Sequence, residues 1–220
     1  MVKAVIFDSD GTLLNSFELI VAAYTHVAEQ HGLRPPTAAE VRAQLGKSLP
    51  DIYRSFYPDA DIDKLLAANS TFIADHAGES EAFEGLEDLL GGLKRLGLQL
   101  GILTGGNHKI TAMLKHHGID QYFASVVHCE RVEKPKPNPE GFFLAAKECG
   151  VEPHEAIMVG DSVQDLMAGK NAGAAFVIAI THGTGKPDYL AACNPDYTVG
   201  SLEELAVLLA KIHAGKALQR

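Results

Sequence analysis

A short apolar segment that ends in two aspartates constrains the fold of this 220-residue chain more than any other feature. Val5-Ile6-Phe7 is short and rich in β-branched residues, which predicts a buried strand rather than a helix. Asp8, Ser9 and Asp10 follow directly, and Gly11 permits a tight exit from the strand. Two carboxylates beside a buried strand are unfavourable because like charges repel and dehydration disfavours ionised groups. A bound cation would remove this cost, whereas the alternative interpretation is an acidic, solvated turn.

Composition narrows the class of protein. A chain of 220 residues can bury a substantial core, either as one domain or as a core with a smaller insert. The formal net charge of −9 argues against nonspecific nucleic-acid binding. No apolar run reaches the length of a membrane span, and no signal peptide is expected. Cys129, Cys149 and Cys193 have no metal-binding spacing, so reduced thiols and a cytoplasmic location are expected.

The segment after the first strand reads as a run of helices. Phe17–Gln30 carries apolar residues at helical spacing, and Pro50 and Pro58 divide the helical pattern that follows. Three further helices are predicted, at Ala38–Leu45, Leu49–Phe56 and Ile62–His76. No strand is predicted between Leu14 and Phe83. We therefore expect a helical cap domain at residues 16–83, inserted after the first strand of a core formed by residues 1–15 and 84–220.

Beyond residue 84 strands and helices alternate over short loops. The predicted helices are Leu86–Leu96, Asn107–His117, Pro139–Cys149, Ser162–Ala172 and Leu202–Ile212. The predicted strands are Leu98–Leu103, Ala124–His128, Ala156–Val159, Ala175–Ile180 and Tyr197–Val199. This order predicts an α/β fold with a doubly wound, Rossmann-like parallel sheet. In such a sheet ligands bind at the carboxyl ends of the strands.

Polar residues follow four of these strands at the point where each strand ends. The first strand is followed by Asp8 and Asp10, and the second by Thr104-Gly105-Gly106-Asn107. The loop after the third strand contains Lys134 and Lys136, and the fourth strand is followed by Gly160-Asp161-Ser162-Val163-Gln164-Asp165. Because these ends share one edge of the sheet, the side chains are expected to meet there. The convergence is more informative than any single residue.

Carboxylates together with lysine and threonine suit a Mg²⁺ ion and a phosphoryl group, since Mg²⁺ prefers oxygen ligands. Asp8 is the candidate nucleophile, which would form an aspartyl phosphate, and Asp10 is the candidate general acid and base. Thr104 and the backbone N–H groups near Gly105, at the start of the predicted Asn107–His117 helix, could hold phosphoryl oxygens. Lys136 would offset charge in the transition state, and Asp161 would complete the metal site.

Four motifs resemble those of the haloacid dehalogenase superfamily. They are Phe7-Asp8-Ser9-Asp10-Gly11-Thr12-Leu13, Leu103-Thr104-Gly105, Lys136-Pro137-Asn138-Pro139-Glu140-Gly141-Phe142 and Gly160-Asp161-Ser162-Val163-Gln164-Asp165. The helical insert resembles the mobile cap of the phosphoglycolate phosphatase and β-phosphoglucomutase branch. The resemblance implies Mg²⁺-dependent phosphoryl chemistry with Asp8 as nucleophile, Asp10 as acid/base and Asp161 as metal ligand. It also implies a metal contact from the backbone carbonyl of Asp10, and the aspartate at this position distinguishes the chain from true dehalogenases.

Several positions in these motifs allow more than one interpretation. Ser9 stands where the family often has an apolar residue, and its side chain is expected to point away from the ligand. Lys136 fits the family motif better than Lys134, which would then be a solvated loop charge. Asp165 could ligate metal through water or orient Lys136 and Asp161, and the orienting role is favoured. Ser162 could contact the metal-site carboxylates, although capping its helix is the simpler role.

The cap is expected to select the substrate. Arg42, Lys47 and Arg54 are the candidate cations for a substrate carboxylate or second phosphate, and the alternative is that each is a solvated helix residue. Gly46-Lys47-Ser48-Leu49 resembles the substrate-facing loop of related caps. The leading hypothesis is a phosphatase of small phosphomonoesters such as phosphoglycolate, with a small phosphorylated metabolite as its ligand. A sugar phosphomutase, a pyrophosphatase and a non-enzymatic regulatory protein are alternatives, and the sequence leaves open a monomer or a dimer.

Overall fold

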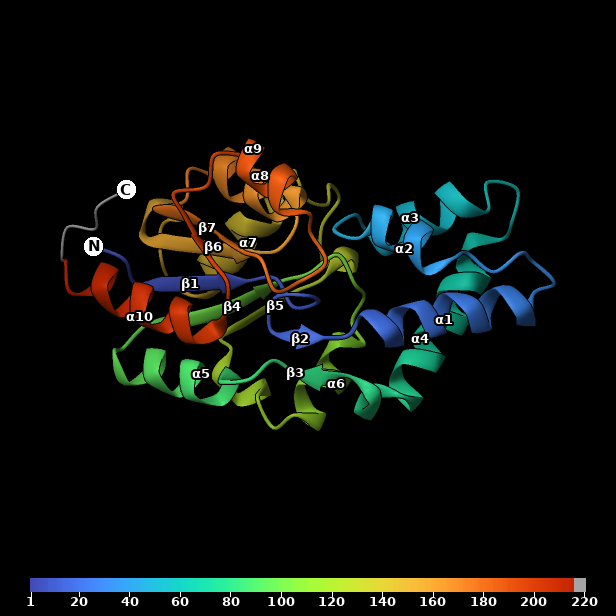
Figure 1. Ribbon diagram of the computed structural model, residues 1–220, viewed down its shortest axis with the longest axis horizontal. Coiled ribbons are helices and arrows are strands. Elements are labelled where there is room, and N and C mark those ends of the chain that lie inside the picture. Colours follow the sequence, from blue (N-terminus) through green and yellow to red (C-terminus); the bar gives the residue numbers. More distant parts are fainter. Residues whose placement is uncertain (216–220) are drawn as a thin grey trace.

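The computed structural model describes residues 1–215 and contains a six-stranded sheet with helices on both faces, joined to a helical part (Figure 1). All strands of the sheet are parallel, in the order β5-β4-β1-β6-β7-β8. Their bounds are β1 Ala4–Phe7, β4 Gln99–Leu103, β5 Ser125–Val127, β6 Ala156–Gly160, β7 Phe176–Ile180 and β8 Tyr197–Val199. β1 lies near the centre, between β4 and β6, so the residues that follow it enter the middle of the sheet edge.

Alternate residues of β1 supply the two faces of the sheet. Val5 and Phe7 pack into one apolar core, and Ala4 and Ile6 pack into the other. The first core is covered by α5 (Leu86–Arg95), α6 (Ile110–His116) and α10 (Leu202–His213), and the second by α7 (Glu140–Glu148), α8 (Val163–Ala172) and α9 (Pro187–Ala192). Helices on both faces of a parallel sheet confirm the predicted doubly wound α/β architecture.

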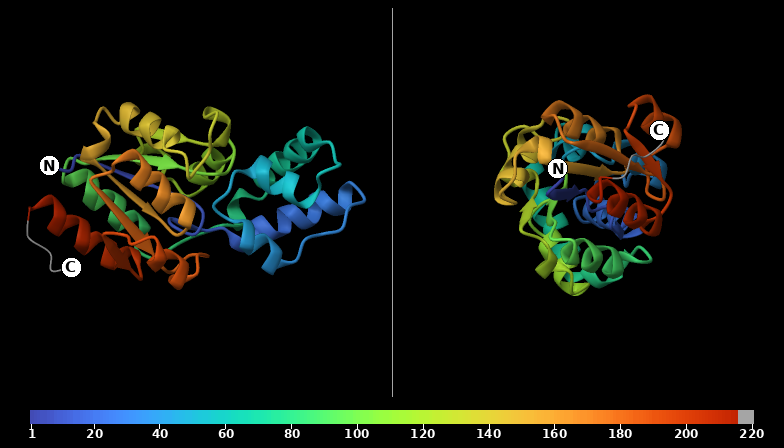
Figure 2. Two further views of the ribbon diagram at one scale, coloured as in Figure 1. Left: turned by 90° about the horizontal axis from the view of Figure 1, so that it is seen from above. Right: turned by 90° about the vertical axis from the view of Figure 1, so that its left-hand side faces the viewer.

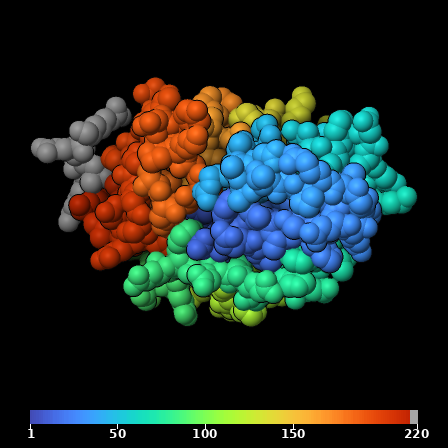
Figure 3. Space-filling model, turned by 45° about the vertical axis from the view of Figure 1, so that its right-hand side comes forward, coloured from blue at the N-terminus to red at the C-terminus, as the bar shows by residue number. Residues whose placement is uncertain are grey.

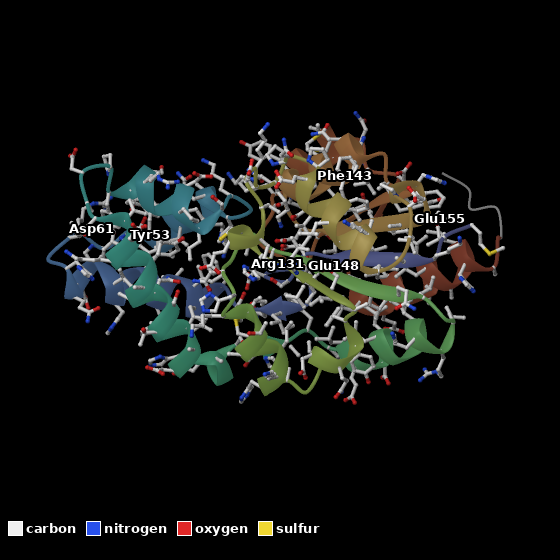
Figure 4. The ribbon with its side chains drawn as sticks, turned by 180° about the vertical axis from the view of Figure 1, so that it is seen from behind. Tyr53, Asp61, Arg131, Phe143, Glu148 and Glu155 are labelled. Atoms are coloured by element: carbon white, nitrogen blue, oxygen red, sulfur yellow. The ribbon has the colours of Figure 1, made fainter. Side chains whose placement is uncertain are left out.

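The helices between β1 and β4 form a part with its own apolar core. They are α1 (Phe17–Gln30), α2 (Ala38–Gln44), α3 (Leu49–Phe56) and α4 (Ile62–Asp75), and they stand to one side of the sheet (Figure 2). Tyr24 and Tyr53 are fully buried in this core, with ring centroids 4.9 Å apart, and Tyr53 lies among these helices in Figure 4. We propose that residues 16–83 form a cap domain, the cap.

The prediction that no strand occurs between Leu14 and Phe83 was wrong. Two short strands, β2 (Leu14–Asn15) and β3 (Glu81–Ala82), pair antiparallel where the chain enters and leaves the cap. Two-residue strands carry no periodic pattern, and this pair exists because the two connecting segments run side by side. The sequence also gave no prediction for α9, although proline in its first turn is a helix-start signal. No helix within residues 1–215 is long and apolar enough to cross a membrane.

Candidate active site

The residues that follow successive strands meet at the carboxyl edge of the sheet. Asp8 follows β1, Thr104 follows β4, Lys136 lies in the loop after β5, and Asp161 follows β6. All four side chains are buried, and they line one cavity of about 100 Å³ together with Asp10. This edge faces the cap, because the cavity is also lined by residues of the cap helices. The predicted convergence of strand-end residues is therefore present in the structure.

Lys136 is the lysine that reaches the centre of this site. Its Nζ donates to Asp8 Oδ1 at 2.7 Å, to Asp165 Oδ1 at 2.5 Å and to the backbone carbonyl of Leu103 at 3.0 Å. Burial disfavours the charged ammonium, but the carboxylates of Asp165 and Asp8 outweigh this effect and raise the pKa of Lys136. Lys134 is exposed to solvent. Lys136 is thus held as a permanent cation against Asp8.

Three buried carboxylates have the spacing of a cation site. Asp8, Asp161 and Asp165 each place one oxygen within 4.8 Å of the others. Burial and the neighbouring carboxylate of Asp165 raise the pKa of Asp161 to about 6 and raise the pKa of Asp8 well above its usual value. When all groups are ionised, the three carboxylates and Lys136 carry a net charge of −2. A divalent cation would neutralise that charge, and the all-oxygen donor set fits Mg²⁺.

The carboxylate of Asp165 is already engaged on both oxygens. Lys136 occupies Oδ1, whereas the backbone N–H and the hydroxyl of Ser162 donate to Oδ2 at 2.9 and 2.5 Å. Ser162 is also the N-cap of α8, since its Oγ accepts from the backbone N–H of Asp165. These contacts suit an orienting role for Asp165 and a capping role for Ser162. Within residues 1–215, Asp8 Oδ2 accepts no hydrogen bond and Asp161 Oδ1 accepts only a long one, from the Thr12 hydroxyl at 3.4 Å, so these two carboxylates have more capacity left for a cation.

Asp10 lies outside the group of three carboxylates. Ser16 donates to Asp10 Oδ1 at 2.5 Å, and the Ser9 hydroxyl lies 3.3 Å from Oδ2. Burial raises the pKa of Asp10 although both serine hydroxyls lower it. Its carboxylate is engaged by these serines, which favours the backbone carbonyl of Asp10 as the metal contact that the family resemblance implied.

The hydroxyl groups of Ser9 and Ser16 both lie against the Asp10 carboxylate. Ser9 is fully buried and does not line the cavity, and its hydroxyl donates to Thr104 Oγ1 at 3.0 Å. Ser16 makes no capping hydrogen bond to α1, because its hydroxyl is given to Asp10 instead. Both serine hydroxyls therefore help to fix the orientation of the Asp10 side chain.

The turn after β4 holds Thr104 beside the cap. Thr104 Oγ1 accepts from the backbone N–H of Gly106 at 3.1 Å. The predicted helix start at Asn107 was wrong, since α6 begins at Ile110 and the intervening residues form a loop. The backbone N–H of Gly105 therefore belongs to this loop and not to a helix terminus.

A fifth strand-end loop, after β7, contacts the site and was not identified from the sequence. Thr184 donates to Asp161 Oδ2 through its backbone N–H at 2.8 Å and through its hydroxyl at 3.0 Å. A Cβ added to Gly183 would lie 2.2 Å from the carbonyl oxygen of Gly11, and one added to Gly185 would lie 1.8 Å from that of Asp161. The glycines on both sides of Thr184 thus let the backbone approach closely. A hydroxyl between two glycines after a strand was the available signal.

The predicted substrate cations of the cap are placed unequally. The Arg42 guanidinium stacks 3.9 Å from the ring centroid of Phe17, and Arg54 pairs with Asp51 at 3.2 Å on the surface. Neither arginine lines the cavity. Lys47 does line it, although its exposed ammonium donates to the Gln44 side chain at 2.7 Å. Of the three candidates, Lys47 lines the cavity, whereas the exposed Arg42 and Arg54 fit the alternative of solvated helix residues.

Comparison with known proteins agrees with the geometry. The family model described as haloacid dehalogenase-like hydrolase matches residues 5–179. The chain belongs to this family. Pyrophosphatase PpaX of Bacillus velezensis is 34% identical over 208 residues, covering 93% of this chain and 94% of that protein. The family membership confirms the resemblance that the four motifs indicated.

Solved structures show the same fold at lower identity. A hydrolase from Pseudomonas syringae has a TM-score of 0.85 at 24% identity and covers 96% of this chain and 99% of its own. A predicted phosphoglycolate phosphatase from Haemophilus somnus has a TM-score of 0.84 at 21% identity, with coverages of 94% and 98%. These likenesses show that solved structures share the fold of this chain over nearly its full length.

Proposed function

We propose that this hydrolase is a Mg²⁺-dependent phosphatase of small phosphomonoesters that works through an aspartyl phosphate on Asp8. The observation that carries the proposal is the 2.7 Å contact between Lys136 Nζ and Asp8 Oδ1, which leaves Oδ2 of Asp8 available for attack. The fixed ammonium would stabilise negative charge as the phosphoryl group transfers. Asp161 and the Asp8 oxygen that does not attack would hold Mg²⁺, with the backbone carbonyl of Asp10 as a third oxygen, and the ion would supply further charge neutralisation at the phosphoryl oxygens.

The proposed reaction has two displacements. In the first, an oxygen of Asp8 bonds to phosphorus, the bond to the leaving oxygen breaks, and the Asp10 carboxylic acid donates a proton to that oxygen. In the second, the Asp10 carboxylate takes a proton from water as the water oxygen attacks phosphorus, releasing phosphate and restoring Asp8. Ser16 and Ser9 would hold the Asp10 carboxyl in place during both steps. Thr104 would bind a phosphoryl oxygen.

The test is Mg²⁺-dependent turnover of p-nitrophenyl phosphate by wild type and by Asp8→Asn. The variant is expected to lose turnover while keeping the circular dichroism spectrum and melting profile of a folded protein. Turnover at the wild-type rate by Asp8→Asn would eliminate Asp8 as the nucleophile. Chelation of Mg²⁺ with EDTA is expected to stop wild-type turnover, and re-addition to restore it.

Pyrophosphate hydrolysis is a second candidate because a relative at 34% identity is named pyrophosphatase PpaX. The sequence favoured phosphoglycolate because cations of the cap were expected to bind its carboxylate. Arg42 and Arg54 are engaged elsewhere, so that support is weaker than the sequence suggested. Ranking phosphoglycolate, pyrophosphate and hexose phosphates by kcat/KM separates a specialist from a generalist, since one outlier names the substrate.

A further inference from the structure

The cap lies closed on the core, so the cavity walls define the space that the leaving group occupies. The backbone N–H of Leu49 donates to the carbonyl of Gly105 at 3.0 Å, and Asn107 Nδ2 donates to Ser70 Oγ at 2.7 Å across the same seam. A Cβ added to Gly105 would lie 2.5 Å from the carbonyl oxygen of Lys47. In the space-filling view the blue cap segment rests directly against the green and orange parts of the core (Figure 3).

The part of the cavity wall that the cap helices and α6 contribute is mostly apolar. It comes from four cap segments and from α6 of the core, and includes Ile20, Leu45, Ile52, Ile73, Ile110 and Met113. Asn69 of α4 also lines the cavity, and its side-chain amide donates to the Tyr53 hydroxyl at 3.0 Å. Side chains of this kind bind apolar groups by removing their surface from water. The contrast with the charged end divides the cavity into a phosphoryl end and an apolar end.

The apolar end offers little to a second anion. Among the residues of 1–215 that line the cavity, the cations are Lys136 and Lys47. Lys136 gives its three N–H donors to Asp8, Asp165 and a backbone carbonyl, whereas the exposed ammonium of Lys47 gives one of its three donors to a glutamine side chain. A carboxylate or second phosphate placed against the apolar wall would lose its hydration and find no free donor on Lys136, which is unfavourable, and Lys47 would be its one cationic partner.

One buried hydroxyl in the cavity wall has an unused donor. Tyr24 is 1% exposed and lines the cavity, and its phenol has no hydrogen-bond partner within residues 1–215. Burial and the neighbouring Tyr53 raise the pKa of Tyr24, so the phenol remains neutral. It can therefore donate one hydrogen bond to an uncharged oxygen of a ligand.

We propose that the substrate is a phosphomonoester whose leaving group is uncharged and mainly apolar, with one oxygen that accepts a hydrogen bond from Tyr24. This inference rests on the phosphatase function proposed above and names its substrate class. It excludes pyrophosphate and phosphoglycolate as preferred substrates, because each places a second anion against the apolar wall. A phosphorylated short-chain alcohol carrying one ether or carbonyl oxygen has the required chemistry.

The deciding experiment compares propyl phosphate with 2-phosphoglycolate, which have similar chain lengths and differ in the terminal charge. With wild type at saturating Mg²⁺, kcat/KM is expected to be at least about 100-fold higher for propyl phosphate. Equal or greater kcat/KM for phosphoglycolate, or for pyrophosphate, would overturn the inference while leaving the phosphatase function intact. Loss of turnover for every phosphoester, p-nitrophenyl phosphate included, would instead overturn the proposed function.

Two variants test the walls directly. Ile73→Lys adds a cation to the apolar end and is expected to shift the preference toward phosphoglycolate by about 10-fold or more, whereas Val207→Lys on the remote surface of α10 leaves it unchanged. Tyr24→Phe is expected to lower kcat/KM for 2-methoxyethyl phosphate about 5-fold relative to butyl phosphate. An unchanged preference in Ile73→Lys contradicts the apolar wall, and an unchanged ratio in Tyr24→Phe contradicts the hydrogen bond.

Discussion

Replacing Lys136 with methionine tests the electrostatics of the site through stability. The Lys136 side chain is 3% exposed and pairs with Asp8 and Asp165 at 2.7 and 2.5 Å. Methionine keeps much of the side-chain volume but leaves both carboxylates buried without a cation. Removing one partner of a buried ion pair costs about 3–5 kcal/mol, so Lys136→Met is expected to lower the free energy of unfolding by that amount in EDTA. Adding Asp165→Asn should recover part of the loss, because it removes one unpaired charge.

Urea unfolding followed by circular dichroism measures this change, provided that the m-value is the same for all variants. Lys134→Met is the matched control, since this lysine is exposed two residues away and its replacement should change the free energy by no more than about 0.5 kcal/mol. Mg²⁺ should reduce the penalty of Lys136→Met by neutralising Asp8. A loss below about 1 kcal/mol in EDTA would refute the assignment of Lys136 as the charge partner of buried carboxylates.

Three further predictions follow from contacts around the site. Thr184→Val removes a hydroxyl that orients Asp161 and is expected to weaken Mg²⁺ binding about 10-fold by calorimetry, and unchanged affinity would contradict that role. Gly105→Ala places a methyl group against a cap carbonyl and is expected to lower kcat/KM. Gly92→Ala, in a half-buried position of α5 where an added Cβ meets only the Arg95 side chain, should leave kcat/KM unchanged. Equal activities of the two variants would argue against a closed cap during turnover. Burial lowers the pKa of His182 in the folded protein. Below about pH 6.5 the unfolded chain therefore binds more protons than the folded one, and the free energy of unfolding should decrease as the pH is lowered. His182→Gln should weaken that pH dependence in thermal melts, and an identical slope would contradict it.

The sequence was sufficient to predict the sheet and the positions of the charged residues in the site. Alternating strands and helices determine a parallel sheet, and a parallel sheet brings residues such as Asp8, Thr104 and Asp161 to one edge whatever the details of packing. The choice between Lys134 and Lys136 depended on a motif, and the structure places Lys136 against Asp8.

Features that depend on side-chain direction could not be predicted in this way. Ser9 and Ser16 both turn to Asp10, because the chain reverses after β1 and returns past its own acid before α1 begins. Helical periodicity placed Arg42 and Arg54 on cap helices but gave no information on the partner of either side chain. In the structure Arg42 stacks on the Phe17 ring, and Arg54 pairs with an aspartate of its own helix.

The apolar wall of the cavity could not be predicted from the sequence either. Ile20, Ile73 and Met113 each read as ordinary core positions of amphipathic helices. Their meeting in one cavity depends on the closed contact between cap and core. The surface that we propose selects the substrate therefore arises from packing between two parts of the chain and not from a motif within either.

The most direct test of the central claim is capture of the phosphorylated enzyme. Wild type mixed with Mg²⁺ and p-nitrophenyl phosphate, quenched in acid during turnover and digested, should yield a phosphoryl adduct on the peptide that contains Asp8. Asp8→Asn treated identically should yield no adduct. A phosphoryl group on a different residue, or turnover by wild type with no adduct at any quench time, would contradict nucleophilic attack by Asp8.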